Sequence, residues 1–356
     1  MIKYTQQSFH KNCKFMFTSI YNRILNYCNS VYKSPSSKTV KKMKEESARW
    51  FIDLLQQRYS TGTSDSPCIH TGNKCVIIMV DNTIYNPGLA DKLRGILSIY
   101  SLCKEKHIDF KINWTYPFEL TNKINWIIEQ EKIKYSLSDS KIVVIDTLPN
   151  IHASRQSIID KKIFDDTVLN SQYLQYHIYT NSIIHTQAFP NLFRELFTPS
   201  EKLQSLIDLH HKNIGEKYVA ASFRFLELLG DFKDSEGMDE MLPPREQKLL
   251  IEQCYIELKK FIDTLPEFYK ILVTSDSERF LAKASTLPRT YIIPGKVIHI
   301  RYKTTDTSAY MKTFLDMFLL SGAESLVLFK TGKMYNSGFP RLASQIGNKH
   351  FKIHEF

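Results

Sequence analysis

The sequence of 356 residues lacks the short motifs that mark several common chemistries. It contains no GxGxxG and no GxxxxGK followed by Ser or Thr, so nicotinamide and P-loop chemistry lack their usual supports. It also contains no HExxH, and no Asp-x-Asp of the kind that holds Mg²⁺ or Mn²⁺ in metal-dependent sugar transferases. We therefore expect neither a metal nor a bound cofactor.

Paired cysteines and long apolar runs are also missing. The six cysteines form no CxxC pair and show no metal-ligand spacing, which fits reduced thiols in a cytosol. No apolar run approaches the roughly 20 residues that span a bilayer. The N-terminus lacks the apolar stretch of a signal peptide. These observations predict a cytoplasmic protein.

Positive charge is concentrated in the first part of the chain. Residues 1–74 carry 12 Lys and Arg against 4 Asp and Glu, whereas the remaining 282 residues carry 35 against 33. The mixture of aromatic and basic residues over positions 1–36 predicts a helix on an anionic membrane surface, a helix packed on the main body, or a solvated tail. Because residues 75–356 have almost no basic surplus, nucleic acid is not an expected partner.

Short apolar runs alternate with helical periodicity along the rest of the chain, which predicts an α/β fold with parallel strands. Residues 151–217 read as mainly helical and irregular, with Thr198 as the expected cap of a helix. We expect a helical extension and linker (residues 1–74) and two Rossmann-like domains, residues 75–200 and 201–356, with a cleft between them. The predicted strands are residues 76–80, 109–114, 141–146, 218–223, 270–275, 291–293, 297–300 and 325–330; the predicted helices are residues 40–59, 89–106, 242–265, 276–285, 307–321 and one that begins near Ser337.

The stretch around residues 325–347 reads as a buried strand, a polar loop and a helix start. Ser337 is a good N-cap, and Pro340 is tolerated in a helix only in its first turn. Such a helix directs free N–H groups and its positive dipole end back towards the strand, which suits a phosphate. An ordinary strand-to-helix connection with nothing bound is the simpler alternative.

Charged and polar groups follow three predicted strands of the second half. Since ligands of such sheets bind beyond the carboxyl ends of the strands, we expect these groups to converge on one edge. Two or three cations and a helix N-terminus would stabilise a departing diphosphate without a metal. For Arg224, a salt bridge to Glu227 is an equal alternative to a contact with the diphosphate. The groups are Arg224, Glu227 and Asp231; Asp276, Ser277 and Glu278; and Lys330, Lys333, Ser337 and Gly338.

Five segments in order resemble motifs of the fucosyltransferase-type glycosyltransferases with two Rossmann-like domains (GT-B). That group includes nodulation and core α-1,6-fucosyltransferases and protein O-fucosyltransferases, and the chain is most similar to bacterial members of surface-polysaccharide clusters. The resemblance spans residues 75–356. Its motifs are Asn86–Gly95, Ser222–Glu227, Thr274–Ser277, Asp316–Ser321 and Ser337–Phe339.

This resemblance implies an inverting, metal-independent transfer of fucose from GDP-fucose to a glycan or lipid-linked saccharide. Arg224 would contact the β-phosphate and steady the charge that develops as the glycosidic bond breaks. The remaining donor-side residues implied are Asp276, Ser277, Asp316, Lys330, Ser337, Gly338 and Phe339; the acceptor-side residues are Asn86, Gly88, Asp91 and Arg94.

The chain departs from the family pattern at Ser222, Phe225 and Ala90, which replace the family's His, second Arg and Gly. The general base is left open between Glu227, Asp231 and Asp91, each of which could equally form a surface salt bridge. The competing interpretation is a non-catalytic protein that binds a membrane or nucleic acid through its basic N-terminal segment.

Overall fold

A computed structural model describes residues 37–61, 73–81, 88–118, 140–145, 153–182, 184, 189–232, 241–300, 303 and 308–356. The predictions for residues 1–36, for most of the linker and for Asn86 lie outside the described residues. The chain forms two compact units, residues 1–77 with 134–185 and residues 78–133 with 186–356. The boundaries predicted after residues 74 and 200 stay predictions.

The first sheet has four strands in the order β2-β1-β4-β3. Its strands are β1 (Cys75–Val80), β2 (Asp109–Trp114), β3 (Ser140–Ile145) and β4 (Gln175–Thr180). The last two are parallel, with Val143 opposite Ile178. Residues 151–217 are mainly helical, as expected, but they also contain β4, which was not predicted. Polar residues interrupt its apolar ones, so it lacks the continuous apolar run of a buried strand.

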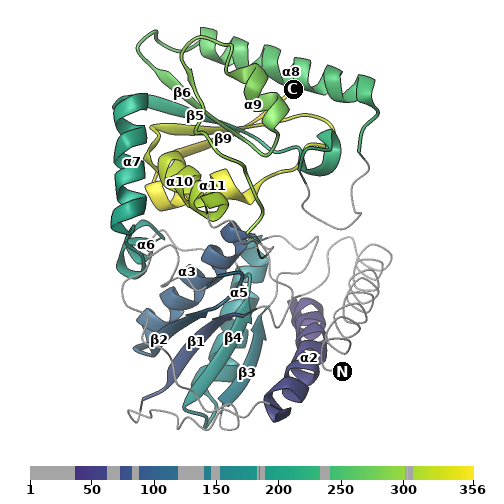
Figure 1. Ribbon diagram of the computed structural model, residues 1–356. Helices are drawn as coiled ribbons and strands as arrows, with labels where there is room; N and C mark the ends of the chain where they lie inside the picture. Colours follow the sequence, from purple (N-terminus) through teal and green to yellow (C-terminus); the bar gives the residue numbers. More distant parts are fainter. Residues whose placement is uncertain are drawn as a thin grey trace, which may run out of the picture. The chain divides into compact units, whose positions relative to one another are not determined.

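Helices precede, separate and follow these strands (Figure 1). Ser200, rather than Thr198, caps α7, because its side chain accepts a hydrogen bond from the Leu203 N–H at 3.2 Å. The helices are α2 (Ser37–Thr61), α3 (Leu89–Lys106), α5 (Ala153–Phe164), which continues into a π-helical turn at Asp165–Leu169, α6 (Phe189–Leu196) and α7 (Glu201–Ile214).

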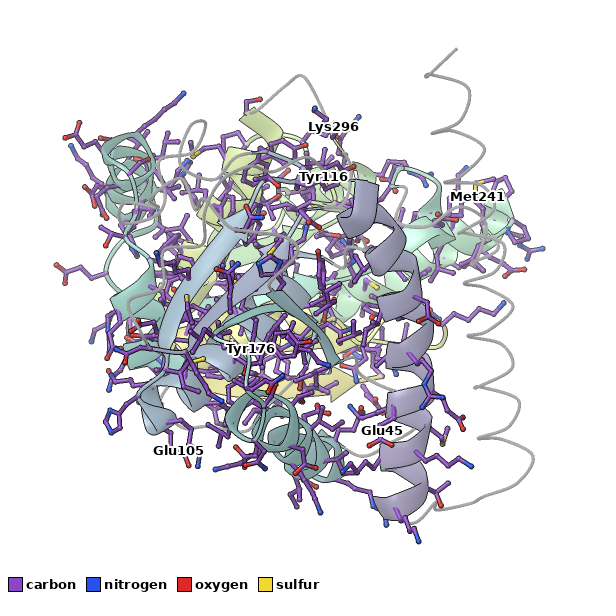
Figure 2. The ribbon with its side chains drawn as sticks, turned by 90° about the horizontal axis from the view of Figure 1, so that it is seen from below. Glu45, Glu105, Tyr116, Tyr176, Met241 and Lys296 are labelled. Atoms are coloured by element: carbon purple, nitrogen blue, oxygen red, sulfur yellow. The ribbon has the colours of Figure 1, made fainter. Side chains whose placement is uncertain are left out.

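Within the first unit, a buried ion pair fastens α2 to α5. Lys44 Nζ lies 2.5 Å from Asp160 Oδ1, and the Ser182 hydroxyl donates to the other oxygen of the same carboxylate. Both charged side chains are almost fully buried, so each requires the other. In the same unit, Lys74 Nζ lies 5.7 Å from the centre of the Tyr176 ring in β4. Figure 2 labels Tyr176 among the side chains of the described residues.

The second sheet has five parallel strands in the order β7-β6-β5-β8-β9. Phe223, at the end of β5, stands opposite Ser275 on one side and Phe329 on the other, so three carboxyl ends lie level. The strand predicted over residues 297–300 is absent from this described segment, and β9 was not predicted. The strands are β5 (Tyr218–Phe223), β6 (Lys270–Ser275), β7 (Thr290–Tyr291), β8 (Ser325–Lys330) and β9 (His350–Glu355).

Helices cover both faces of this second sheet. Figure 1 shows α8 (Pro244–Asp263) and α9 (Glu278–Ala284) on one face, and α10 (Ser308–Gly322) and α11 (Gly338–Gly347) on the other. A short 3₁₀ turn, η2 (Leu226–Leu229), follows β5. The α/β class with parallel-strand sheets is therefore confirmed. None of the described helices has the length and apolar composition needed to cross a bilayer.

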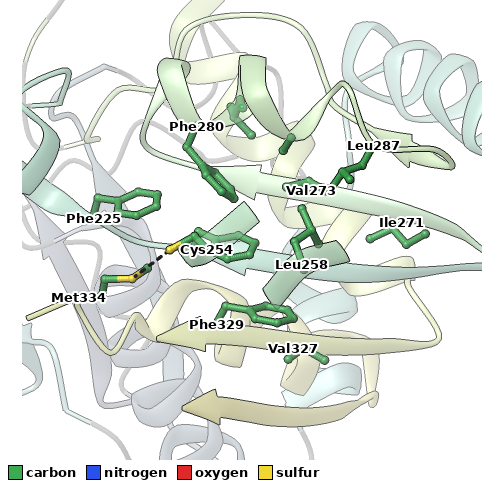
Figure 3. Packing of buried hydrophobic residues seen from close by; sticks show 14 of the residues in the cluster. Phe225, Cys254, Leu258, Ile271, Val273, Phe280, Leu287, Val327, Phe329 and Met334 are labelled. Atoms are coloured by element: carbon green, nitrogen blue, oxygen red, sulfur yellow. Dashed lines mark hydrogen bonds between the residues drawn. The ribbon is translucent and has the colours of Figure 1, made fainter. Parts of the chain in front are cut away.

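Aromatic rings pack at the carboxyl ends of the central strands, between the sheet and α8 and α9 (Figure 3). The Phe223 ring stacks on Phe329 with centroids 4.8 Å apart and meets Phe280 at 4.4 Å. Phe225, directly after Arg224, lies fully buried in the same cluster and contacts Phe280 at 5.3 Å. Each buried Phe stabilises the fold by about 1.5–3 kcal/mol, so packing fixes the end of β5, where the loop containing Arg224 begins.

Candidate functional site

The loops that follow β5 and β8 are joined by a backbone hydrogen bond. The N–H of Tyr335 donates to the carbonyl oxygen of Arg224 at 3.1 Å. This bond connects the residue after β5 to the polar loop between β8 and α11. Two of the three predicted loops therefore meet at the carboxyl edge of the sheet, as expected from the parallel order of their strands.

The predicted start of α11 is confirmed. Ser337 is its N-cap, and the Ser337 side chain accepts a hydrogen bond from the Phe339 N–H at 3.3 Å. Pro340 occupies the first turn, where its missing N–H removes no helical bond. The positive end of the α11 dipole thus lies directly at the loop that Tyr335 connects to Arg224.

Arg94 of α3 lies against this helix start. A Cβ atom placed on Gly338 would lie only 2.9 Å from Arg94 Nη1, so the glycine makes room for the guanidinium. The side chain of Arg94 is 15% exposed, and its Nη2 donates to Asp91 in the first turn of α3. Its Nε is buried and has no hydrogen-bond partner among the described residues.

Electrostatics at Arg94 favour an anion. Burial lowers the pKa of Arg94, the nearby Tyr335 opposes that shift, and the positive charge of Arg341 in α11 adds to it. A guanidinium keeps its charge even so. Two arginines and a helix N-terminus therefore concentrate positive potential around Gly338. Arg94 was predicted to lie on the acceptor side, and its contact with the predicted donor loop was not anticipated.

Arg224 is fixed from two directions. Its Nε lies 3.3 Å from Asp276 Oδ2, and its guanidinium carbon lies 4.4 Å from the centre of the Phe232 ring. The side chain is 18% exposed. A charged partner on one edge and an aromatic ring on one face restrict the orientation of the guanidinium.

Asp276 lies beneath this arginine, and its side chain is fully buried. Its Oδ1 accepts from the Phe225 N–H at 2.9 Å, and its Oδ2 accepts from the Leu226 N–H at 2.7 Å. Burial raises the pKa of Asp276, while Arg224 and the two N–H groups oppose that rise. The predicted donor contact through Asp276 stays a prediction.

Ser277 and Asp231 have a local structural role at the start of α9. The Ser277 hydroxyl accepts from the Phe280 N–H at 3.1 Å and donates to Asp231 Oδ2 at 2.7 Å. The same Asp231 oxygen accepts from the Arg279 N–H at 3.2 Å. Lys330, a further predicted donor-side residue, lies 3.5 Å from Glu355 in β9.

Asp316 in α10 is almost fully buried and is paired with Lys312, which sequence reasoning did not single out. Lys312 Nζ lies 2.5 and 2.6 Å from the two carboxylate oxygens. Burial raises the pKa of Asp316, and Lys312 opposes the rise. The signal was available, since a Lys and an Asp four residues apart share one face of a helix.

The start of α3 contains the remaining predicted residues that the structure describes. Gly88 is the N-cap of α3, and a Cβ placed there would lie 3.0 Å from Nε2 of His299. Asp91 is 36% exposed, and Glu227 in η2 is half-buried. His299 was not anticipated, because it lies 211 positions after Gly88 and no local pattern connects the two.

Among the described residues, no group of three or more His, Cys, Asp and Glu side chains could hold a metal ion. The expectation that the protein needs no metal stays a prediction. The arginines described above could neutralise the charge of a phosphate. The carboxylates near them are already paired with Arg, Lys or backbone N–H groups.

No protein-family model and no curated protein matches the chain. Solved structures similar to it include fucosyltransferases, the group that the five motifs resemble. The NodZ enzyme from Bradyrhizobium has 12% identity and a TM-score of 0.47, with 76% of this chain and 92% of that chain covered. A FUT1 mutant of Arabidopsis thaliana with GDP has 14% identity and a TM-score of 0.47, with 91% and 80% covered.

A POFUT1 structure with GDP-fucose has 9% identity and a TM-score of 0.44, with 80% of this chain and 98% of that chain covered. At identities of 9–14% and TM-scores below 0.5, these similarities carry no argument about this chain. The function of the chain therefore has to be inferred from its own residues.

Proposed function

We propose that this protein is a glycosyltransferase that takes fucose from GDP-fucose and inverts the configuration at the anomeric carbon. The observation that carries the proposal is the contact of the Arg94 guanidinium with Gly338 at the positive end of α11. The Tyr335 N–H bonds to the backbone carbonyl of Arg224, so the same loop is joined to the segment that carries a second arginine. The order of the five family-like motifs supports the choice of donor.

The chemistry requires positive charge at the leaving group. An acceptor hydroxyl attacks the anomeric carbon, a base takes its proton, and the bond between that carbon and the β-phosphate oxygen breaks with its electrons on the phosphate. Arg94, Arg224 and the N–H groups of α11 are suited to that developing charge. Charge-assisted hydrogen bonds contribute about 1.5–3 kcal/mol each, so these groups can act without a metal.

The base is proposed among two carboxylates. Asp91 is 36% exposed although it accepts from Arg94, and Glu227 is partly exposed, whereas Asp231 is 18% exposed and accepts hydrogen bonds from Ser277 and Arg279. A base must reach the acceptor hydroxyl in the bound complex, which favours the more accessible groups. Asp91→Asn and Glu227→Gln would separate the candidates, because loss of the true base should lower kcat and abolish the fall in activity at acidic pH that protonation of its carboxylate causes.

For the acceptor, we propose a glycan or lipid-linked saccharide of bacterial surface-polysaccharide synthesis, used at the cytoplasmic face of the membrane. The excess of Lys and Arg in residues 1–74 supports peripheral contact with anionic lipid. Replacing Lys3, Lys11 and Lys14 by Glu should release the protein from anionic vesicles in a sedimentation assay. Unchanged sedimentation would reject this contact.

A nucleotide panel tests the main proposal. GDP should raise the melting temperature more than UDP or dTDP, because a ligand that binds only the folded state stabilises it by about 2.7 kcal/mol at 100 times its Kd. Arg224→Ala should reduce GDP release from GDP-fucose by about 100-fold or more. Arg245→Ala, which removes an exposed arginine of α8, is the matched control and should leave the rate unchanged.

Two outcomes would contradict the proposal. If none of the three nucleotides raises the melting temperature, the proposal that the protein is a glycosyltransferase is rejected. A clear preference for UDP would remove GDP-fucose as the donor while leaving sugar transfer itself in place.

A further inference from the structure

The loop that carries Arg224 contains a strained backbone position. Leu226, two residues later, has φ +54°, in the left-handed region that a side chain with a Cβ disfavours. Such strain persists only where surrounding contacts over-determine the conformation, and it is concentrated at functional sites. The contacts that impose it here identify the group responsible.

That group is Asp276. Its two oxygens accept the N–H groups of Phe225 and Leu226 at 2.9 and 2.7 Å, which turns the chain immediately after Arg224. Its Oδ2 also lies 3.3 Å from Arg224 Nε. One buried carboxylate therefore fixes both the backbone that follows the arginine and one edge of its guanidinium.

The surroundings make this carboxylate unsuited to contact a ligand directly. Its side chain is fully buried, and backbone N–H groups engage both of its oxygens. Phe225 is fully buried in the core cluster below it, and Phe232 covers one face of the guanidinium. The packing of Phe225 in the core and the hydrogen bonds to the Asp276 carboxylate thus both fix the loop.

We infer that Asp276 is a positioning residue: it fixes the orientation in which the Arg224 guanidinium meets the donor diphosphate, and it does not itself bind the nucleotide sugar. The inference rests on the proposed function and changes the role that the family resemblance implied for Asp276. A fixed guanidinium meets a phosphate without reorganisation, whereas a free one has to be ordered on binding.

A double-mutant cycle on GDP affinity tests this inference. Asp276→Asn keeps the shape of the side chain, removes the charge beside Arg224 and places an amide donor where two acceptors are needed. We expect it to weaken GDP binding about tenfold in the wild-type background and by less than about twofold in the Arg224→Ala background. Calorimetric titration measures both, because binding remains measurable when turnover is lost.

Two further variants separate positioning from folding. Leu226→Gly accepts the positive φ without strain, so Asp276→Asn in that background should fold even if the single variant does not. Asp160→Asn removes a buried, paired carboxylate of the other unit and serves as the matched control; it should lower the melting temperature and leave GDP affinity unchanged.

The outcomes are distinct. A tenfold loss that disappears without Arg224 supports the inference. An equal loss in both backgrounds, or no loss in the Leu226→Gly background, overturns it while GDP still binds the wild type. Failure of GDP to bind the wild type would reject the proposed function, and with it the reaction that Asp276 is inferred to serve.

Discussion

Gly338→Ala should separate ligand affinity from stability. Within a helix, alanine is normally more favourable than glycine, by up to about 1 kcal/mol in the interior, and Gly338 is the first residue of α11. At this position, however, the new methyl group would lie 2.9 Å from Nη1, 3.4 Å from Cζ and 3.5 Å from Nη2 of Arg94. The obstructing atoms are the end of a flexible side chain, so the guanidinium should move aside and α11 should stay intact.

The displacement sets the size of the effect. The methyl group needs an additional gap of about 0.5 Å to reach ordinary van der Waals distance, which moves the guanidinium away from the positive end of α11. Losing one charge-assisted hydrogen bond to a phosphate costs about 1.5–3 kcal/mol. Since each 1.4 kcal/mol is about tenfold in affinity, GDP binding should weaken about 10-fold to 150-fold.

Calorimetric titration with GDP and urea unfolding together give the measurement. Gly332→Ala is the matched control, because Gly332 lies in the same loop, has φ +51° and has no atom within 4 Å of the place where an added methyl group would lie. It should lose about 1 kcal/mol of stability through strain and keep its GDP affinity. A Gly338→Ala protein that binds GDP as tightly as the wild type would refute the role given to Arg94.

Two further predictions concern the first unit. Burial lowers the pKa of His177 to about 4, below its ordinary 6.5, so the unfolded state binds the proton first and stability should fall by about 3 kcal/mol as pH drops from 6.5 to 4. His177→Gln should remove that part of the pH dependence in urea unfolding, and an unchanged dependence would assign it to other groups. Lys44→Met leaves Asp160 buried without its cation and should destabilise the protein by about 3–5 kcal/mol. Adding Asp160→Asn should recover much of that loss; if the double variant is no more stable, the cost lies in packing.

Local chemistry explains what sequence reasoning predicted correctly. The cap at Ser337 and the place of Pro340 depend on neighbouring residues, and the aliphatic strands β1, β5, β6 and β8 stand out as continuous apolar runs. The alternation of strands and helices then places Arg224 and the loop before Ser337 at one sheet edge.

Long-range contacts explain what sequence reasoning missed. Arg94 and Gly338 are 244 positions apart, so only the fold brings them together. The two backbone N–H groups that Asp276 accepts belong to a loop 50 residues earlier, and no side-chain pattern encodes such bonds. The strands β4 and β9 were missed because polar residues interrupt their apolar ones.

Arg94, Arg224 and the start of α11 all belong to the unit of residues 78–133 and 186–356. If they bind the nucleotide as proposed, one unit of the chain contains every positive group described for the donor. Donor binding would then be independent of acceptor binding. GDP released by the reaction would then compete with GDP-fucose for the same groups at every acceptor concentration. Competitive inhibition by GDP would therefore follow from the arrangement of these groups.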